Sequence, residues 1–151
     1  MSSNESTTFD PVDYDIPSHF QHYPGDTAED FIGPFFFHRE HEACVEGSKC
    51  YAAFRVQPHH CNMGKSTHGG ILMSFADYCL CMAAFSPDLV GVLTVNCNSD
   101  FIGSSKAGDL IMGEAEITRN GKSLAFTRCR LLVNDQPIMT ASGVIKKLYA
   151  R

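Results

Sequence analysis

An acidic residue in the middle of an apolar segment is the first feature of this sequence that could do chemistry. Asp77 lies within residues 69–85, where nearly all other side chains are apolar. If this segment is a helix, the side chains three and four positions away carry no positive charge to pair with Asp77. Because burial penalises an unpaired carboxylate, a catalytic acid or base explains Asp77 as well as a structural Asp that bonds to a distant backbone group or faces water.

A histidine and two glycines directly precede this segment. His68-Gly69-Gly70 lies where the helix would begin, and glycines there let a ligand approach the backbone closely. The first N–H groups of a helix have no partner within it, and together with the positive end of the helix dipole they suit a developing oxyanion. The same motif also describes an ordinary helix start, so on its own it indicates an oxyanion site only weakly.

The histidines and cysteines near the segment predict neither a metal site nor a Cys–His nucleophile. Their spacings match no standard zinc pattern, and Cys79 and Cys81 would point to different sides of a helix. A pair such as Cys61 and His68 lacks a third residue that would orient it. The seven cysteines contain no CxxC pair, and we expect them to be free thiols.

The elements that must position these residues follow from the pattern of apolar side chains. Residues 69–85 are predicted as one long helix, and because they are apolar almost all round, the helix should be buried. Asn120-Gly121 is typical of a type I′ hairpin turn. Strands are predicted before and after the helix, over residues 49–56, 93–101, 110–119, 123–133 and 138–148.

A single apolar helix needs a sheet around it to cover most of its circumference. We therefore predict an α+β fold, in which one long buried helix is wrapped by a curved antiparallel sheet of five to six strands. The 151 residues suffice for one domain, which we place at residues 31–151. Residues 1–30 are rich in Asp, Pro, Ser and Thr and are predicted to form a flexible acidic arm.

Composition restricts the partners and the location of the protein. The net charge of −5 argues against nucleic acid as the main partner, although residues 104–151, with eight Lys and Arg against four Asp and Glu, could receive a small polyanion. No apolar run approaches the roughly 20 residues that cross a bilayer. The polar, acidic start lacks the features of a signal peptide, so we expect a cytoplasmic protein with no membrane partner.

Taken together, these motifs resemble the PaaI-like branch of the hotdog-fold acyl-CoA thioesterases, the group related to the phenylacetic-acid-degradation thioesterase. The matching pattern is Asn62, then His68-Gly69-Gly70, then Asp77. The similarity covers about residues 48–148, whereas the first 45 residues have no counterpart. The resemblance implies the hotdog fold, which is the same helix-in-sheet arrangement that the apolar pattern predicts.

The resemblance implies hydrolysis of an acyl-CoA thioester to free CoA and a carboxylic acid. In this reaction the Gly69 N–H would polarise the thioester carbonyl, and Asp77 would act as general base on water or as nucleophile. Asn62 would hold the water or the carbonyl, and Thr94 would assist the carboxylate. Because thiolate is a good leaving group, we expect no metal or organic cofactor beyond the coenzyme A of the substrate.

The resemblance also suggests residues that bind the substrate. His68 would shape the entrance near the sulfur, with Gly70 beside it, and Arg119 and Lys122 would bind the phosphates of coenzyme A. Two alternatives stay open. One is a hotdog-fold dehydratase or hydratase, although no second acid lies near His68 in the sequence. The other is a non-catalytic acyl-CoA-binding or interaction protein.

The spacing of Gly69 and Asp77 indicates that two chains build each site. The two residues are eight positions apart, which corresponds to roughly 12 Å along a helix. A reacting carbonyl must lie within about 3–4 Å of both groups, so one straight helix cannot supply both. Two antiparallel helices related by a two-fold axis can, and the resemblance likewise implies a homodimer, often paired into a homotetramer.

Overall fold

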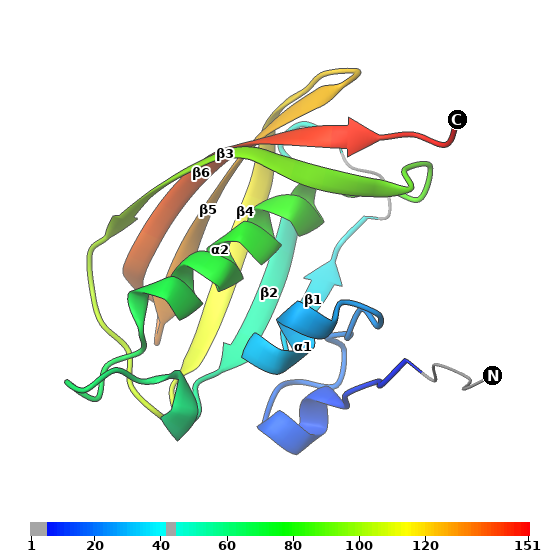
Figure 1. The fold of residues 1–151 in the computed structure, drawn as a ribbon. Coiled ribbons are helices and arrows are strands. Elements are labelled where there is room, and N and C mark those ends of the chain that lie inside the picture. Colours follow the sequence, from blue (N-terminus) through cyan, green and yellow to red (C-terminus); the bar gives the residue numbers. More distant parts are fainter. Residues whose placement is uncertain (1–5, 42–44) are drawn as a thin grey trace.

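The long helix α2 (Gly69–Ala84) lies in the hollow of a curved antiparallel sheet, in a computed structural model that describes residues 6–41 and 45–151 (Figure 1). Six strands follow the order β1-β2-β4-β5-β6-β3 across the sheet. This is the α+β hotdog architecture that the sequence predicts. The strands are β1 (Phe36–Arg39), β2 (Lys49–Arg55), β3 (Gly91–Phe101), β4 (Leu110–Asn120), β5 (Leu124–Val133) and β6 (Gln136–Leu148).

Helix α2 is buried on most of its circumference, but one side stays open. Its inward side chains, among them Phe75, Cys79 and Leu80, belong to the main hydrophobic core under the sheet. No helix within residues 6–41 or 45–151, α2 included, is long and apolar enough to span a membrane. Residues at helical spacing on the other side are half-buried or exposed, and we call them the open stripe of α2: Gly70, Ser74, Asp77 and Cys81.

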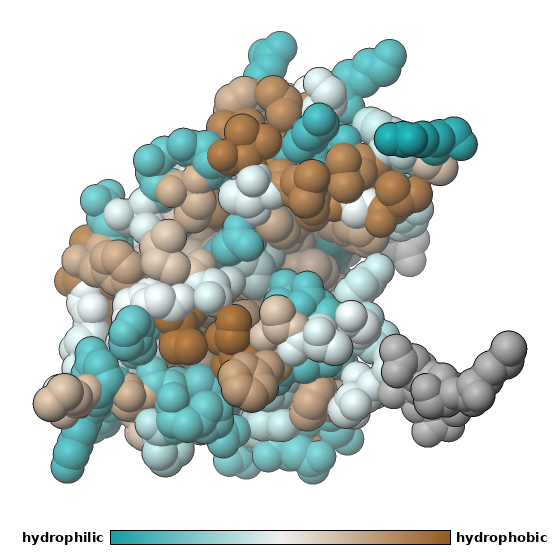
Figure 2. Space-filling model, viewed as in Figure 1, coloured by the Kyte–Doolittle hydropathy of each residue, from teal (hydrophilic) through white to brown (hydrophobic). Residues whose placement is uncertain are grey.

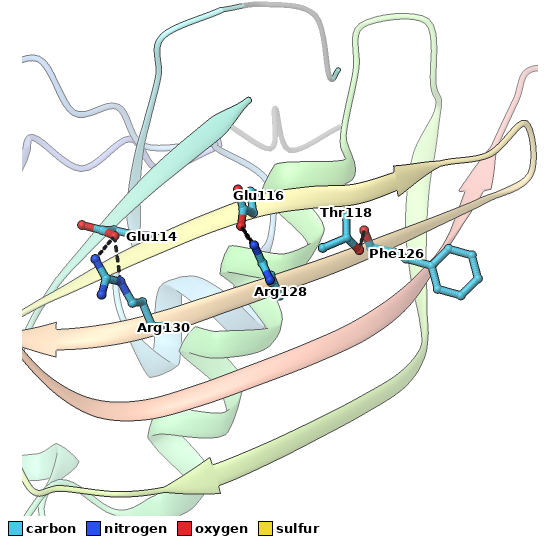
Figure 3. Close-up of polar contacts among 6 residues, drawn as sticks. All are labelled: Glu114, Glu116, Thr118, Phe126, Arg128 and Arg130. Carbon is cyan, nitrogen blue, oxygen red and sulfur yellow. Dashed lines mark hydrogen bonds and ion pairs between the residues drawn. The ribbon is translucent and has the colours of Figure 1, made fainter. Parts of the chain in front are cut away.

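The residues of β4 and β5 alternate between the core and the outer face of the sheet. Inward residues such as Ile117 are buried. Outward residues form ion pairs between the two strands, Glu116 with Arg128 at 2.5 Å and Glu114 with Arg130 at 2.8 Å (Figure 3). The outer face is therefore polar, and the residues predicted to do chemistry on α2 lie on the other side of the sheet.

The prediction of a type I′ turn at Asn120-Gly121 is wrong. Neither residue has the positive φ that this turn requires, and the last paired residues are Asn120 and Ala125, which leaves a four-residue loop. The buried faces of β4 and β5 set this register, together with a bulge between Ile117 and Arg119. Positive φ values at two successive turn residues occur instead at the β5–β6 connection, with 49° at Asn134 and 64° at Asp135.

The described part of the predicted flexible arm packs against the edge of the sheet. Ile16 and Phe20 are 2% and 4% exposed, and they form a second hydrophobic cluster with Phe36 and Ala53. Arg55 reinforces this contact by donating to the backbone carbonyls of residues 14 and 15. The few apolar side chains of this segment thus find an apolar surface on β1 and β2, while the flexibility of residues 1–30 stays a prediction. The domain boundary at residue 31 stays a prediction.

Candidate active site

Helix α2 and the strand beside it bring two polar side chains together on the open stripe. Thr94 on β3 donates its hydroxyl proton to Oδ1 of Asp77 over 2.5 Å. The end of β3 places the ring of Phe101 beside Gly69, so β3 runs antiparallel along α2. The two residues that the resemblance pairs, Asp77 and Thr94, are therefore in direct contact, 17 residues apart in the chain.

Cys81 is a third member of this cluster, which the sequence did not identify as a site residue. Its Sγ lies 3.2 Å from Oγ1 of Thr94 and 4.0 Å from Oδ1 of Asp77. Burial, and then the negative charge of Asp77, raises the pKa of the Cys81 thiol to about 12. The group is therefore a neutral thiol that can donate a weak hydrogen bond, and its position four residues after Asp77 is the sequence signal that could have found it.

At the N-terminus of α2, the backbone N–H of Gly69 has no hydrogen-bond acceptor among the described residues. His68 is the N-cap residue, and its Nδ1 accepts the N–H of Gly70 at 2.9 Å. The carbonyl of His68 accepts the N–H groups of Ile71 and Leu72. No acceptor among residues 6–41 and 45–151 takes the N–H of Gly69. Gly69, and not Gly70, therefore presents the free donor that an oxyanion needs.

The capping bond also fixes the chemistry of His68. Because Nδ1 accepts a hydrogen bond, neutral His68 carries its proton on Nε2. A side chain on Gly70 would place its Cβ only 3.1 Å from Nδ1 of His68. The predicted substrate-binding pair His68 and Gly70 thus forms a local cap, in which the exposed His68 ring keeps one N–H donor available.

Asn62 lies in an exposed loop before the helix. Its Oδ1 accepts the N–H of Ser66 at 3.2 Å, and its backbone N–H donates to the carbonyl of the same residue at 2.8 Å. The side-chain amide N–H groups of Asn62 have no acceptor in the part of the chain that the structure describes. Within one protomer the hydrogen bonds do not join Asn62 to Asp77.

Arg119 and Lys122, the predicted phosphate partners, lie at the β4–β5 hairpin. This hairpin is at the end of the sheet where β3 begins, because Lys146 of β6 pairs with both Leu93 and Leu124. The carbonyl of Lys122 accepts the hydroxyl proton of Tyr149. No hydrogen bond between described residues joins either side chain to Asp77 or to the α2 N-terminus, so their predicted role depends on the path that coenzyme A takes.

The cysteines and histidines of the described residues show no metal-binding arrangement, since no group of three or more His, Cys, Asp or Glu converges there. Six cysteines are free thiols, and Cys44 lies outside the described residues. A groove of about 770 Å³ lies on the outer face of the sheet, lined in part by the Glu–Arg pairs of Figure 3. It contains none of the predicted site residues.

The two halves of the predicted site are separated within one chain. Helix α2 is continuous from Gly69 to Ala84, so Gly69 and Asp77 are roughly 12 Å apart along its axis. Strand β3 is an edge of the sheet, and Leu93, Val95 and Phe101 on it are 55%, 61% and 54% exposed. Figure 2 shows hydrophobic side chains gathered over the first half of this strand. The exposed apolar edge strand β3 thus runs beside both Gly69 and Asp77.

Comparison with known proteins defines the class to which this fold and site belong. Residues 64–139 match the thioesterase superfamily. A protein of Pseudomonas aeruginosa, "Putative esterase PA0474", is 32% identical over 117 residues, which cover 76% of this chain and 84% of that protein. The chain therefore belongs to the thioesterase superfamily.

Solved structures identify the branch that the fold resembles. The PaaI protein of the E. coli phenylacetic acid degradation operon superposes with a TM-score of 0.69 at 21% identity, covering 82% of this chain and 86% of that one. A hypothetical thioesterase of Streptococcus pneumoniae, solved with coenzyme A, has a TM-score of 0.65 at 15% identity, covering 76% and 90%. These likenesses confirm the hotdog fold and the predicted resemblance to PaaI-like proteins.

Proposed function

We propose that this protein hydrolyses acyl-CoA thioesters to free CoA and a carboxylic acid. The observation that carries the proposal is the Asp77–Thr94 pair on the open stripe of a helix whose first N–H, at Gly69, has no acceptor in the described chain. Thioester hydrolysis needs these two elements, a carboxylate for water and a donor for the oxyanion. The solved relatives that hold coenzyme A or acetyl-CoA support the choice of substrate class.

Each group has one task in this reaction. The Gly69 N–H donates to the thioester carbonyl oxygen, where negative charge develops as water attacks the carbonyl carbon. Asp77 takes a proton from that water through Oδ2, because Thr94 already occupies Oδ1. The C–S bond then breaks, and the CoA thiolate leaves with the electron pair. Asn62 presents its unused amide N–H groups to the water or to the carbonyl.

The site requires two copies of the chain in this proposal. Two α2 helices that run antiparallel place Gly69 of one protomer beside Asp77 of the partner subunit. The exposed apolar residues of edge strand β3 supply a surface on which the copies can pair, and burial of such residues drives association. The symmetric arrangement gives two identical sites per dimer, and a pair of such dimers would form the tetramer that the resemblance implies.

A panel of aliphatic and aromatic acyl-CoA thioesters, followed with a thiol-detecting reagent, tests the proposal. The expected result is release of free thiol from at least one member of the panel, unchanged by a metal chelator. The Asp77→Asn protein, purified in parallel, is the matched control for contaminating hydrolases. If no thioester yields thiol above that control while the protein binds acyl-CoA, the protein is a binding protein and the proposal is wrong.

A further inference from the structure

Phe101, the last residue of β3, places an aromatic ring against the residue that presents the free N–H. A side chain on Gly69 would have its Cβ 3.4 Å from Cε1 and 3.6 Å from Cζ of this ring, so the ring borders the space that such a side chain would fill. Phe101 is nevertheless 54% exposed. The ring is therefore an open apolar wall beside the donor that the proposed reaction uses.

The position of this ring is fixed from both directions along the chain. Two residues earlier, the hydroxyl of Ser99 donates to Sδ of Met73 at 2.7 Å. Four residues later, the carbonyl of Ser105 accepts the N–H of Thr67 at 2.8 Å, and its buried hydroxyl donates to the Thr67 hydroxyl at 2.6 Å. Because Met73 belongs to α2 and Thr67 directly precedes its N-cap, these bonds hold Phe101 beside the N-terminus of the helix.

The contact of Phe101 is the first in a row of contacts between β3 and α2. Four residues spaced by four positions lie on this side of the helix: Gly69, Met73, Asp77 and Cys81. Phe101 contacts the first, Ser99 the second, and Thr94 the third and fourth. The row is thus apolar at the oxyanion donor and polar at the carboxylate. Only the ring of Phe101 contacts Gly69, so the backbone edge of β3 stays free to pair with a second copy.

Three phenylalanines of the core beneath α2 are closed to a substrate. Phe35, Phe54 and Phe75 pack on one another with ring centroids 5.0–5.5 Å apart, and none is more than 2% exposed. Together with the surrounding aliphatic side chains they fill the main core. A group bound at the Gly69 N–H therefore contacts the exposed ring of Phe101 rather than these core rings.

We propose that Phe101 determines the specificity of the thioesterase site, which takes thioesters of apolar acyl groups with several carbons, aliphatic or aromatic. This inference rests on the proposed function. A thioester carbonyl carries two substituents, the sulfur of CoA and the acyl carbon. The pantetheine arm beyond the sulfur contains amides that lose hydrogen bonds with water on an apolar surface, whereas a hydrocarbon gains free energy by leaving water. The ring beside the oxyanion donor therefore suits the acyl side of the carbonyl.

The size of the expected preference follows from the hydrocarbon that the ring covers. Each methylene that leaves water completely contributes roughly four-fold to binding. A single ring covers one side of a chain, so we expect roughly two-fold per methylene. Hexanoyl-CoA, which is several methylenes longer than acetyl-CoA, should then be preferred by about 10-fold in kcat/KM.

Steady-state kinetics of the full-length protein with acetyl-, hexanoyl- and benzoyl-CoA tests the role of Phe101. The wild type should prefer at least one of the two larger thioesters over acetyl-CoA by about 10-fold in kcat/KM. Phe101→Ala should lose most of this preference. Phe101→Leu, which keeps an apolar side chain, should keep part of it, and it provides the same test if the alanine variant does not fold.

The ratio of kcat/KM values is the decisive readout, because a general structural defect would slow all three thioesters equally. Phe126→Ala is the matched control, since it removes an exposed ring from β5 on the outer face of the sheet (Figure 3). It should keep the wild-type ratio. A folded Phe101→Ala protein that also keeps the wild-type ratio would overturn the proposal.

Binding of unreactive S-alkyl-CoA thioethers separates this proposal from the proposed function. Isothermal titration calorimetry should show that the wild type binds S-hexyl-CoA about 10-fold more tightly than CoA, and that Phe101→Ala loses this difference while it binds CoA as before. Equal affinities of the wild type for both ligands would refute the proposal, as would a Phe101→Ala protein that binds CoA itself more weakly and keeps the difference. A difference that depends on Phe101, in a protein that hydrolyses no thioester, would refute only the proposed hydrolysis.

Discussion

Thr94 donates its hydroxyl proton to Oδ1 of Asp77 over 2.5 Å, from an edge strand to the open stripe of the central helix. The bond engages Oδ1 and leaves Oδ2 for the water of the proposed reaction. Among the described residues, Thr94 is the strong hydrogen-bond donor to this carboxylate, whereas the thiol of Cys81, at 4.0 Å, is a weak donor. This relationship connects the position of β3 to the chemistry of α2.

Loss of the Thr94 hydroxyl should slow turnover while the fold persists. Thr94→Ala is expected to lower kcat about 10-fold, because a hydrogen bond to a charged group contributes on that scale. Thr94→Ser keeps the hydroxyl and should restore most of the rate, whereas Thr94→Val keeps the shape and should not. Steady-state kinetics on one acyl-CoA substrate measures all three, and wild-type kcat in Thr94→Ala would remove Thr94 from the mechanism.

Cys81 should resist alkylation in the folded protein. Its thiol pKa of about 12 leaves a negligible thiolate fraction at pH 8, and the thiolate is the reactive form. Mass spectrometry of peptides after treatment with iodoacetamide should find Cys81 unmodified in the native protein and modified after unfolding in urea. Rapid labelling of Cys81 in the native state would mean that the Asp77–Thr94–Cys81 cluster is more open and more polar than described.

Glu29→Gln should stabilise the protein more at high pH than at low pH. Burial, followed by the negative charge of Asp26, raises the folded-state pKa of Glu29, in the short helix α1 (Thr27–Ile32), from its ordinary value of 4.5 to about 7. Unfolding therefore releases a proton between these values, and wild-type stability falls as the pH rises through this window. The Gln variant has no such proton to release. Thermal melts at pH 5 and pH 8 should therefore show a larger gain in Tm at pH 8, and an equal gain at both would contradict the raised pKa.

The sequence predicts the parts of this structure that follow from local pattern. The apolar run of residues 69–85 gives the helix, and alternation gives the strands, because periodicity reports directly which face is buried. The type I′ turn predicted at Asn120-Gly121 was wrong because the turn type depends on strand register, and distant core residues set that register. The packing of Ile16 and Phe20 was missed for a similar reason, since isolated apolar residues in a polar segment do not reveal a surface that covers them.

The candidate site likewise contains residues that the sequence indicates and residues that only the structure reveals. Asp77 and Gly69 could be found because their residue types are unusual in and before an apolar helix, whereas Asn62 was indicated only by the resemblance to PaaI-like thioesterases. The sequence signal for Cys81 is its position four residues after Asp77, but a core cysteine would show the same spacing, and the distance to Thr94 is what assigns Cys81 to the cluster.

A shared site predicts recovery of activity when two inactive variants are combined. Asn62→Ala chains and Asp77→Ala chains, unfolded together and refolded, should form about half mixed dimers by random pairing. If Asn62 acts beside Gly69 of its own chain, each mixed dimer holds one intact site and one doubly damaged site. About a quarter of wild-type activity should then return. A mixture that stays as inactive as its parents, with chain exchange confirmed by mass spectrometry, would refute the two-chain site.

The most direct test of the account is the rate of CoA release by Asp77→Asn. The substitution keeps the size of the side chain and the hydrogen bond from Thr94, but it removes the negative charge that takes a proton from water. We predict normal folding by circular dichroism and a loss of at least about 100-fold in kcat on the best acyl-CoA of the panel, the usual scale for a general acid–base group. A folded Asp77→Asn protein that releases CoA at close to the wild-type rate would contradict it.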